Sequence, residues 1–323
     1  MNAACKSAGL AAIWPAAVWM AALAIGAVRL APAQDALRPI REAQGPQSLS
    51  QNASAYFEMP VAKLKGAVPE LRGLRFDAGQ ERLLPVLAGV AKTIEAVLPR
   101  LPDLASREDV YHFSAPDSAF SGLASAEPWS RQFRYLILTH HNSDGSTTIN
   151  ELRTDSKGRT VDRSGDFTTP SGYGFANEWL FFRAANQREF RFRYLGEQDK
   201  EGRKTFVVVF AQDPAKVTNP AHFQSQGKTA PFFYQGVLWI DQSSFDIVML
   251  RTDLLAPLPD LSLRQMTTEV TFHSVPIRGF GEVFWLPSQV YLSNDQGAGP
   301  VEETHRYSDY HLFHAEVRIV DSP

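Results

Sequence analysis

The sequence predicts an α+β fold in which a helical segment is followed by a large antiparallel β-sheet. Between Leu83 and Leu98 the apolar residues recur at steps of three and four, which is the period of one face of a helix. After about residue 107 the apolar residues recur at every second position, which is typical of strands. Short connectors join these segments without intervening helices, so we expect neighbouring strands to pair antiparallel.

Composition and charge narrow the class of protein. Of the 323 residues, 44% are hydrophobic and 21% are charged, which fits a packed globular protein rather than a disordered chain. The formal net charge is −3, and acidic and basic residues are interspersed. The sequence lacks the basic stripe that nucleic-acid binding requires, so we expect no nucleic-acid partner.

Residues 1–33 are predicted to be a secretory signal peptide. An uncharged apolar run, LAAIWPAAVWMAALAIGAV, is followed by Ala31 and Ala33 in the A-x-A arrangement that precedes cleavage. Cleavage between Ala33 and Gln34 predicts a periplasmic or secreted product. The alternative is an uncleaved membrane anchor, because the apolar run approaches the length that spans a bilayer.

The cysteine content bears on the chemistry of the mature chain. The only cysteine, Cys5, lies inside the predicted signal peptide. After cleavage we therefore expect no disulfide, no thiol nucleophile and no cysteine-bound metal.

The remaining chain is predicted to hold one domain. Residues 34–54 are rich in Ala, Gln, Ser and Pro without periodicity and are expected to be a flexible lead-in. Residues 55–323 are expected to form a single α+β domain. Its helical segment is predicted over about residues 60–105, and its antiparallel sheet over about 107–315.

Local signals predict where the main helix begins and ends. Asp77, with Gln80 three residues later, is a candidate N-cap. Pro85 either lies near the start of the helix or kinks it. Pro99 is expected to end the helix, because the residue before a proline is disfavoured in the helical region.

Nine segments are expected to be strands, and several form pairs around turn signals such as SDGS, DQSS and NDQGAGP. They are FRYLILTHH (133–141), TINELRT (148–154), FRFRYL (190–195), TFVVVFA (205–211), VLWI (237–240), FDIVML (245–250), TTEVTFHSV (267–275), VFWLPSQVYLS (283–293) and ETHRYSDYHLFH (303–314).

Two of these strand pairs resemble a known family. Trp239-Ile240-Asp241, a polar turn and the returning FDIVMLRTD resemble the late hairpin of periplasmic lipoprotein-carrier and outer-membrane lipoprotein-sorting proteins. RFRYLGEQDKEGRKTFVVVFA is similar to the strand, turn and strand that precede this hairpin, and the resemblance covers about residues 130–315. The RYLG, WID and RTDLLAP stretches also resemble secreted bacterial proteins without an assigned function.

The resemblance implies an incomplete antiparallel barrel, a large curved sheet with helices covering its concave side. It further implies that the apolar interior receives acyl chains, so that the partner is a lipid or a lipoprotein acyl chain, with an envelope protein as a further candidate partner. No ligand-contacting residue of the family matches a position in this sequence.

Aromatic side chains recur along the expected strands and in GYGFANEWLFFRAANQ (172–187), which is either a short helix or a loop. The resemblance implies that they line an apolar groove for an acyl chain. The alternative is that they fill the core between sheet and helix. The candidate groove residues are Trp179, Phe181, Phe182, Phe192, Phe206, Trp239, Phe272 and Trp285.

The last expected strand carries the strongest polar cluster. Glu303, His305, Tyr307, Asp309 and His311 share one face of an extended strand. His305, Asp309 and His311 are candidate metal ligands, but the two histidines would lie about 20 Å apart, so a shared metal needs a sharp bend. The alternative is a solvated sheet face.

The sequence contains no catalytic signature: no Gly-x-Ser-x-Gly elbow, no H-E-x-x-H, no phosphate-cradling loop and no dinucleotide fingerprint. Arg251 and Asp253 share a strand face and are expected to form an ordinary surface ion pair. We therefore predict a non-catalytic, cofactor-free, extracytoplasmic protein of the bacterial envelope that binds a lipid or lipoprotein acyl chain. The alternatives are a protein-interaction or sensor module with a filled core and a metal-dependent hydrolase built around His305, Asp309 and His311.

Overall fold

A computed structural model describes residues 56–114, 128–143, 146–161, 175–225, 227–297 and 299–313. The predicted signal peptide and lead-in, residues 1–54, lie outside these ranges and remain predictions from the sequence. Within the described ranges, no helix combines the length and the apolar character needed to cross a membrane.

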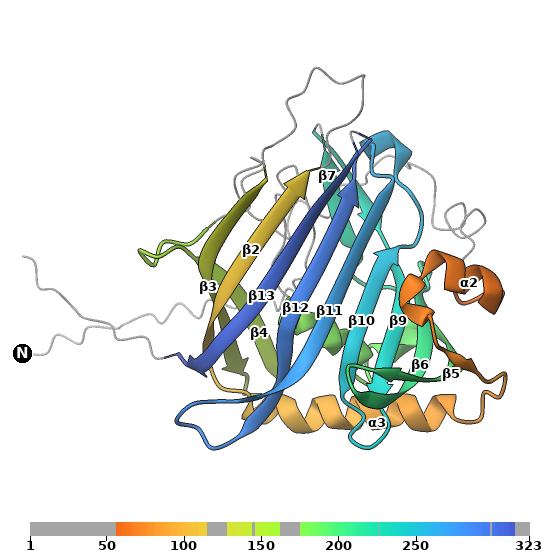
Figure 1. The fold of residues 1–323 in the computed structure, drawn as a ribbon, viewed down its shortest axis with the longest axis horizontal. Helices are drawn as coiled ribbons and strands as arrows, with labels where there is room; N and C mark the ends of the chain where they lie inside the picture. Colours follow the sequence, from red (N-terminus) through yellow and green to blue (C-terminus); the bar gives the residue numbers. More distant parts are fainter. Residues whose placement is uncertain are drawn as a thin grey trace, which may run out of the picture.

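The strands form one large antiparallel sheet whose two edges stay apart. The described residues contain an 11-stranded sheet in the order β1-β5-β6-β9-β10-β11-β12-β13-β2-β3-β4, and a separate pair, β7-β8. Figure 1 shows the strands of the large sheet side by side, with the long helix α3 running across their lower ends. The predicted α+β class and the open antiparallel sheet are confirmed.

The nine expected strand segments are all found among the described strands, whereas β1, β2, β7 and β8 were not among them. The strands are β1 (Arg75–Phe76), β2 (Leu104–Ser114), β3 (Trp129–His141), β4 (Thr147–Thr154), β5 (Phe190–Lys200), β6 (Arg203–Gln212), β7 (Ala221–Ser225), β8 (Lys228–Phe232), β9 (Tyr234–Asp241), β10 (Ile247–Leu254), β11 (Gln265–Pro276), β12 (Val283–Asp295) and β13 (Pro300–Leu312). The helices are α2 (Val61–Ala67) and α3 (Leu83–Val97), with 3-10 helices η2 (Pro69–Leu71), η3 (Leu98–Arg100), η4 (Phe175–Phe182), η5 (Gln187–Glu189) and η6 (Pro259–Leu261).

The hairpin predicted from VLWI, DQSS and FDIVML is confirmed. β9 and β10 pair antiparallel, with Leu238 opposite Leu250. The turn is held by Asp241, whose Oδ1 accepts the backbone N–H groups of Ser243 and Ser244 at 2.8 and 2.9 Å. A carboxylate that satisfies the backbone of its own turn is a local signal, which is why the sequence predicts this hairpin well.

One pairing joins parts of the chain that are far apart in sequence. β2, which follows η3, pairs with β13, the last strand of the sheet. This contact unites the β2-β3-β4 meander with the meander that runs from β9 to β13. The prediction paired strands that follow one another in the sequence, so it did not include this contact.

The inner face of the sheet, defined here as the face against α3 and η4, holds the main core. Val90 and Ile94 of α3 and Phe182 of η4 belong to the same buried cluster as Phe210 and Leu238 of the sheet. Apolar residues four apart place one stripe of α3 against the strands. The predicted helical stripe therefore covers this face.

The start of α3 differs from the prediction. Asp77 does not cap the helix, which begins six residues later at Leu83. The backbone N–H of Asp77 donates to Leu195 O at 2.9 Å, and the Gln80 side chain bonds both the N–H and the C=O of Tyr194. The segment is thus held against β5, and the helix forms only after it.

The outer face of the sheet is also covered in part. An N-terminal arm, residues 56–74, packs Leu64 of α2 and Leu71 of η2 on a second buried cluster that includes Val209 and Trp239. Figure 1 shows α2 beside β9 and β10, on the opposite side of the sheet from η4. The prediction placed the helices on the concave side, and α2 is the exception.

The predicted surface ion pair between Arg251 and Asp253 is instead buried under this arm. Arg251 binds Asp253 at 2.8 and 2.9 Å, Glu70 of the arm at 3.0 Å and Glu269 of β11 at 2.6 Å. The side chain of Arg251 is only 9% exposed. The expectation of a solvated pair was wrong because the sequence gives no sign that the arm folds over this face.

Candidate functional site

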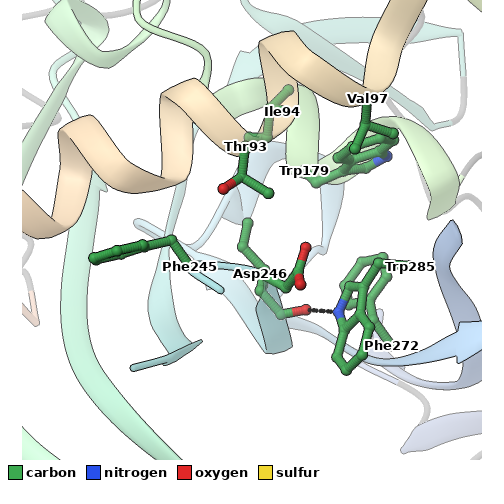
Figure 2. Close-up of a pocket in the computed structure, with 9 residues that line it drawn as sticks. Thr93, Ile94, Val97, Trp179, Phe245, Asp246, Phe272 and Trp285 are labelled. Atoms are coloured by element: carbon green, nitrogen blue, oxygen red, sulfur yellow. Dashed lines mark hydrogen bonds between the residues drawn. The ribbon is translucent and has the colours of Figure 1, made fainter. Parts of the chain in front are cut away.

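An apolar pocket lies between α3 and the inner face of the sheet. It is lined by Thr93, Ile94 and Val97 of α3, Trp179 of η4, Phe245, Asp246 and Ile247 at the start of β10, Phe272 of β11 and Trp285 of β12 (Figure 2). Its volume of about 20 Å³ is enough for one water-sized group. The pocket is a small gap that remains between α3, the turn that precedes β10 and the inner face of the sheet.

The turn between β9 and β10 attaches the sheet to α3. The hydroxyl of Thr93 donates to the backbone oxygen of Ser244 at 3.0 Å. Phe245 has a φ of 61°, a left-handed conformation that is rare and strained for an aromatic residue. A Cβ at Gly89 of α3 would lie 2.4 Å from the Phe245 ring, so the ring packs where only glycine leaves room.

The opposite wall is fixed by Trp285. Its indole N–H donates to Ile247 O at 2.5 Å, which ties β12 to the first residue of β10. The guanidinium of Arg203 lies over the same indole, 4.6 Å from the ring centroid, and pairs with Asp241 at 2.9 Å. Burial acts to raise the pKa of Asp241, but the hydrogen bonds from Ser243 and Arg203 outweigh it and hold that pKa below its ordinary value.

Asp246 brings the single ionisable group among the lining residues. Figure 2 shows its carboxylate beside the indole of Trp285, toward the interior of the pocket. Burial raises the pKa of Asp246, Asp241 raises it further, and Ser244 and Arg203 lower it, so that the net shift is upward. The carboxylate is therefore partly desolvated but not neutralised by a neighbouring cation.

The structure separates the predicted aromatic residues into three groups. Trp179, Phe272 and Trp285 line the pocket. Phe181, Phe182, Phe192 and Phe206 belong to the same inner cluster but pack on other aromatic rings: Phe182 lies 6.4 Å from both Phe181 and Phe192, and Phe206 lies 6.3 Å from Phe245.

Trp239 does not belong to this site. It lies in the outer cluster under the arm, and its indole N–H donates to Gln198 Oε1 at 3.0 Å. Its neighbours Leu238 and Ile240 belong to the inner cluster instead. Because side chains alternate along a strand, Trp239 must point outward, and its assignment to the groove was wrong.

Sequence reasoning missed several lining residues. Ile94 and Val97 stood in the predicted helical stripe, and that stripe was the signal that could have placed them against the sheet. Phe245 and Ile247 stood in the predicted hairpin. Asp246 carried no signal, because a single acidic residue after a turn is ordinary.

The candidate metal ligands do not come together. His305 is fully buried, whereas Asp309 is exposed and His311 is half-buried. Asp309 has a φ of 56°, and the pairing register shifts between Ser308 and His311, so a bulge breaks the alternation that placed all three on one face. Among the described residues, no group of three His, Cys, Asp or Glu side chains is arranged to hold a metal ion.

The predicted solvated face of β13 is instead the centre of a buried ionic network. Arg153 of β4 donates two hydrogen bonds to Glu108 of β2, at 2.5 and 2.6 Å. His305 Nδ1 and the Tyr307 hydroxyl also bond Glu108, at 2.8 and 3.0 Å. Burial acts to raise the pKa of Glu108, but Arg153 and His305 together outweigh burial and hold this pKa at about 2.

The network continues to a second carboxylate. His305 Nε2 lies 3.2 Å from Glu303, and His112 Nδ1 lies 2.9 Å from the same group. Burial acts to lower the pKa of His305, but hydrogen bonds with Glu108 and Glu303 outweigh it and raise this pKa. Charged and titratable side chains of β2, β4 and β13 thus meet in one buried network at the junction of β2 and β13.

Comparison with known proteins gives matches in structure only. No family model and no curated protein matches the sequence. The structure is similar to that of a DUF1329 family protein from Desulfovibrio piger, with 13% identity, a TM-score of 0.38, and coverage of 71% of this chain and 93% of that one.

Two further solved structures are similar to this one at a comparable level. One is a putative outer membrane lipoprotein-sorting protein domain from Vibrio parahaemolyticus, with 12% identity, a TM-score of 0.36, and coverage of 70% of this chain and 92% of that one. The other is a LolA superfamily protein from Nitrosomonas europaea, with 12% identity, a TM-score of 0.33, and coverage of 71% and 94%.

Proposed function

We propose that the protein is a non-catalytic, extracytoplasmic binding protein for a lipid or lipoprotein acyl chain. The observation that supports this proposal is the apolar pocket between α3 and the inner face, walled by Ile94, Trp179, Phe272 and Trp285. Each methylene that leaves water for such a site contributes about 0.8 kcal/mol, so a long chain binds without specific polar contacts.

An acyl chain requires the pocket to widen. A volume of about 20 Å³ is far below the several hundred Å³ of typical ligand sites. Ion pairs of α3 and η3 with the rest of the domain, Arg183 with Glu95 and Arg100 with Glu282, involve part-exposed side chains. Such pairs contribute about 0–1 kcal/mol each, so separating α3 from the sheet would cost mainly its buried apolar contacts, which an acyl chain in the widened pocket would replace.

The first test is whether the protein carries or binds an apolar ligand. The protein is purified from the envelope without detergent, extracted with organic solvent and examined by mass spectrometry, and is then titrated with Nile red, a neutral apolar dye. We expect co-purified lipid and a saturable increase in fluorescence. Lipid-free protein that also leaves the dye unchanged would overturn the proposal.

A pair of variants of α3 locates the binding site. Val97→Phe enlarges a side chain that lines the pocket, whereas Leu84→Phe enlarges one that is 75% exposed on the same helix. We expect Val97→Phe to weaken Nile red binding at least about tenfold, because it fills the entry between helix and sheet. Leu84→Phe is expected to bind as the native protein does.

A second candidate function is a protein-interaction or sensor module on the same scaffold. The small pocket volume favours it, as do the closely packed inner rings, such as Phe182 and Phe210 at 5.1 Å. A module with a filled core binds through its surface. In that case neither native lipid nor Nile red binds, and Val97→Phe behaves like Leu84→Phe.

A further inference from the structure

We propose that Asp246 makes the pocket selective for alkyl ligands whose polar end is an ammonium or another N–H donor, and that it disfavours free fatty acids. This inference rests on the proposed function and specifies its ligand class. The ligand's alkyl chain would lie between α3 and the sheet, and its polar end would meet the Asp246 carboxylate.

Two of the three side-chain donors that line the pocket are already bound within the protein. The Trp285 indole N–H is bound to Ile247 O, and the Thr93 hydroxyl donates to Ser244 O. Among the lining residues, the indole N–H of Trp179 is the side-chain donor left for a ligand, and the Asp246 carboxylate is the charged acceptor. A ligand end that only accepts hydrogen bonds therefore has one neutral donor to bind, whereas an ammonium meets a full negative charge, and hydrogen bonds to charged groups are the stronger ones.

The charges near the pocket also favour a ligand with a cationic end. Arg203 is the cation beside Trp285, but it is paired with Asp241 at 2.9 Å. Asp241 Oδ1 is in turn occupied by Ser243 and Ser244. Arg203 also attracts the Asp246 carboxylate, but the two carboxylates, Asp241 and Asp246, outnumber this one cation, so the site keeps a net negative charge toward a ligand.

The poor solvation of the Asp246 carboxylate is a further reason to expect an ammonium ligand. Burial raises its pKa, which means that its charged form is poorly solvated where it stands. An ammonium group that binds there restores the lost interactions of the carboxylate. A carboxylate ligand adds a second negative charge at short range instead.

The experiment compares three ligands that differ only in the polar end. Decylamine, decanol and decanoate are used to displace bound Nile red at pH 7 from the native full chain and from Asp246→Asn. We expect decylamine to displace the dye from the native protein at about tenfold lower concentration than decanoate, with decanol between them. In Asp246→Asn, decylamine and decanoate should act at similar concentrations, while decanol acts as before.

A matched control and three outcomes complete the test. Asp199→Asn removes an exposed carboxylate that pairs with Arg75, and it should keep the native preference for decylamine. Displacement by decanoate at or below the decylamine concentration, or a preference unchanged in Asp246→Asn, overturns the inference and leaves the proposed function intact. Failure of Nile red to bind the native protein overturns the proposed function and the inference with it.

Discussion

Arg153 and Glu108 form a two-point ion pair inside the sheet, with hydrogen bonds of 2.5 and 2.6 Å and side chains that are 1% and 0% exposed. Arg153 lies on β4 and Glu108 on β2, and β3 runs between them. The pair thus links β4 to β2 across β3. The hydroxyl of the buried Tyr307 donates a further hydrogen bond to Glu108. A charge at this position is stable only while its partner is present.

Removal of one partner of this pair is expected to destabilise the protein strongly. Arg153→Met leaves Glu108 charged and buried, which costs about 3–5 kcal/mol of unfolding free energy. Arg159→Met, which removes an exposed pair with Asp155, should cost about 0–1 kcal/mol. Urea unfolding of both variants measures the difference. Equal decreases in unfolding free energy for the two variants would contradict this prediction.

The pH dependence of stability is expected to depend on Glu178. Burial and the nearby Glu151 together raise its pKa to about 8, with burial the larger cause. Glu151 accepts hydrogen bonds from the backbone N–H groups of Ala176 and Asn177. The folded state therefore binds a proton on Glu178 that the unfolded state releases above its ordinary pKa of 4.5. Stability from this group is present below pH 4.5 and falls by about 1.4 kcal/mol per unit as the pH rises toward 8.

Glu178→Gln tests this sign, because it removes the titrating proton and keeps the shape of the side chain. We expect the native protein to lose stability relative to the variant between pH 5 and pH 8, as measured by urea unfolding at several pH values. A constant difference between the two proteins over this range would contradict the raised pKa.

Substitution of Gly89 by alanine is expected to destabilise the protein, which is the opposite of its usual effect in a helix. In most helices Gly→Ala is stabilising by about 0.5–1 kcal/mol. Here the new Cβ would meet the Phe245 ring at 2.4 Å, so Gly89→Ala should destabilise by about 1–3 kcal/mol. In a Phe245→Ala background the same substitution should become stabilising. A thermodynamic cycle of the four proteins measures this coupling, and additive effects would contradict the contact.

The sequence predicts this fold well where the signals are local. Alternation and a turn that satisfies its own backbone place β9 and β10, and a stripe of apolar residues places α3. The sequence could not predict which residues of β9 lie on the inner face of the sheet, because all residues of this strand are buried. When a strand is covered on both faces, Leu238 and Trp239 are equally apolar, and alternation carries no information about which one faces the site.

The polar residues were harder to place for a different reason. His305 and Asp309 share a face only if β13 alternates without interruption, and the bulge near Ser308 ends that alternation. The burial of His305 depends on Glu108 and Arg153, which lie on strands far away in the sequence. Long-range contacts of this kind leave no periodic pattern in a single sequence.

The N-terminal arm is expected to depend on one buried ion pair. Glu70 of η2 accepts a hydrogen bond from Arg251 at 3.0 Å, and Arg251 also binds Glu269, whose pKa is raised to about 7 by burial and by Glu70. Glu70→Ala removes the arm's ionic contact with the sheet and should increase amide hydrogen exchange over α2 and η2 at least tenfold, while β9 and β10 stay protected. Glu58→Ala is the control, because Glu58 lies on the same arm but forms a part-exposed pair with Arg191. If the two variants exchange alike, apolar contacts such as that of Leu64 with the outer cluster are sufficient to hold the arm, and the pair with Arg251 adds nothing measurable.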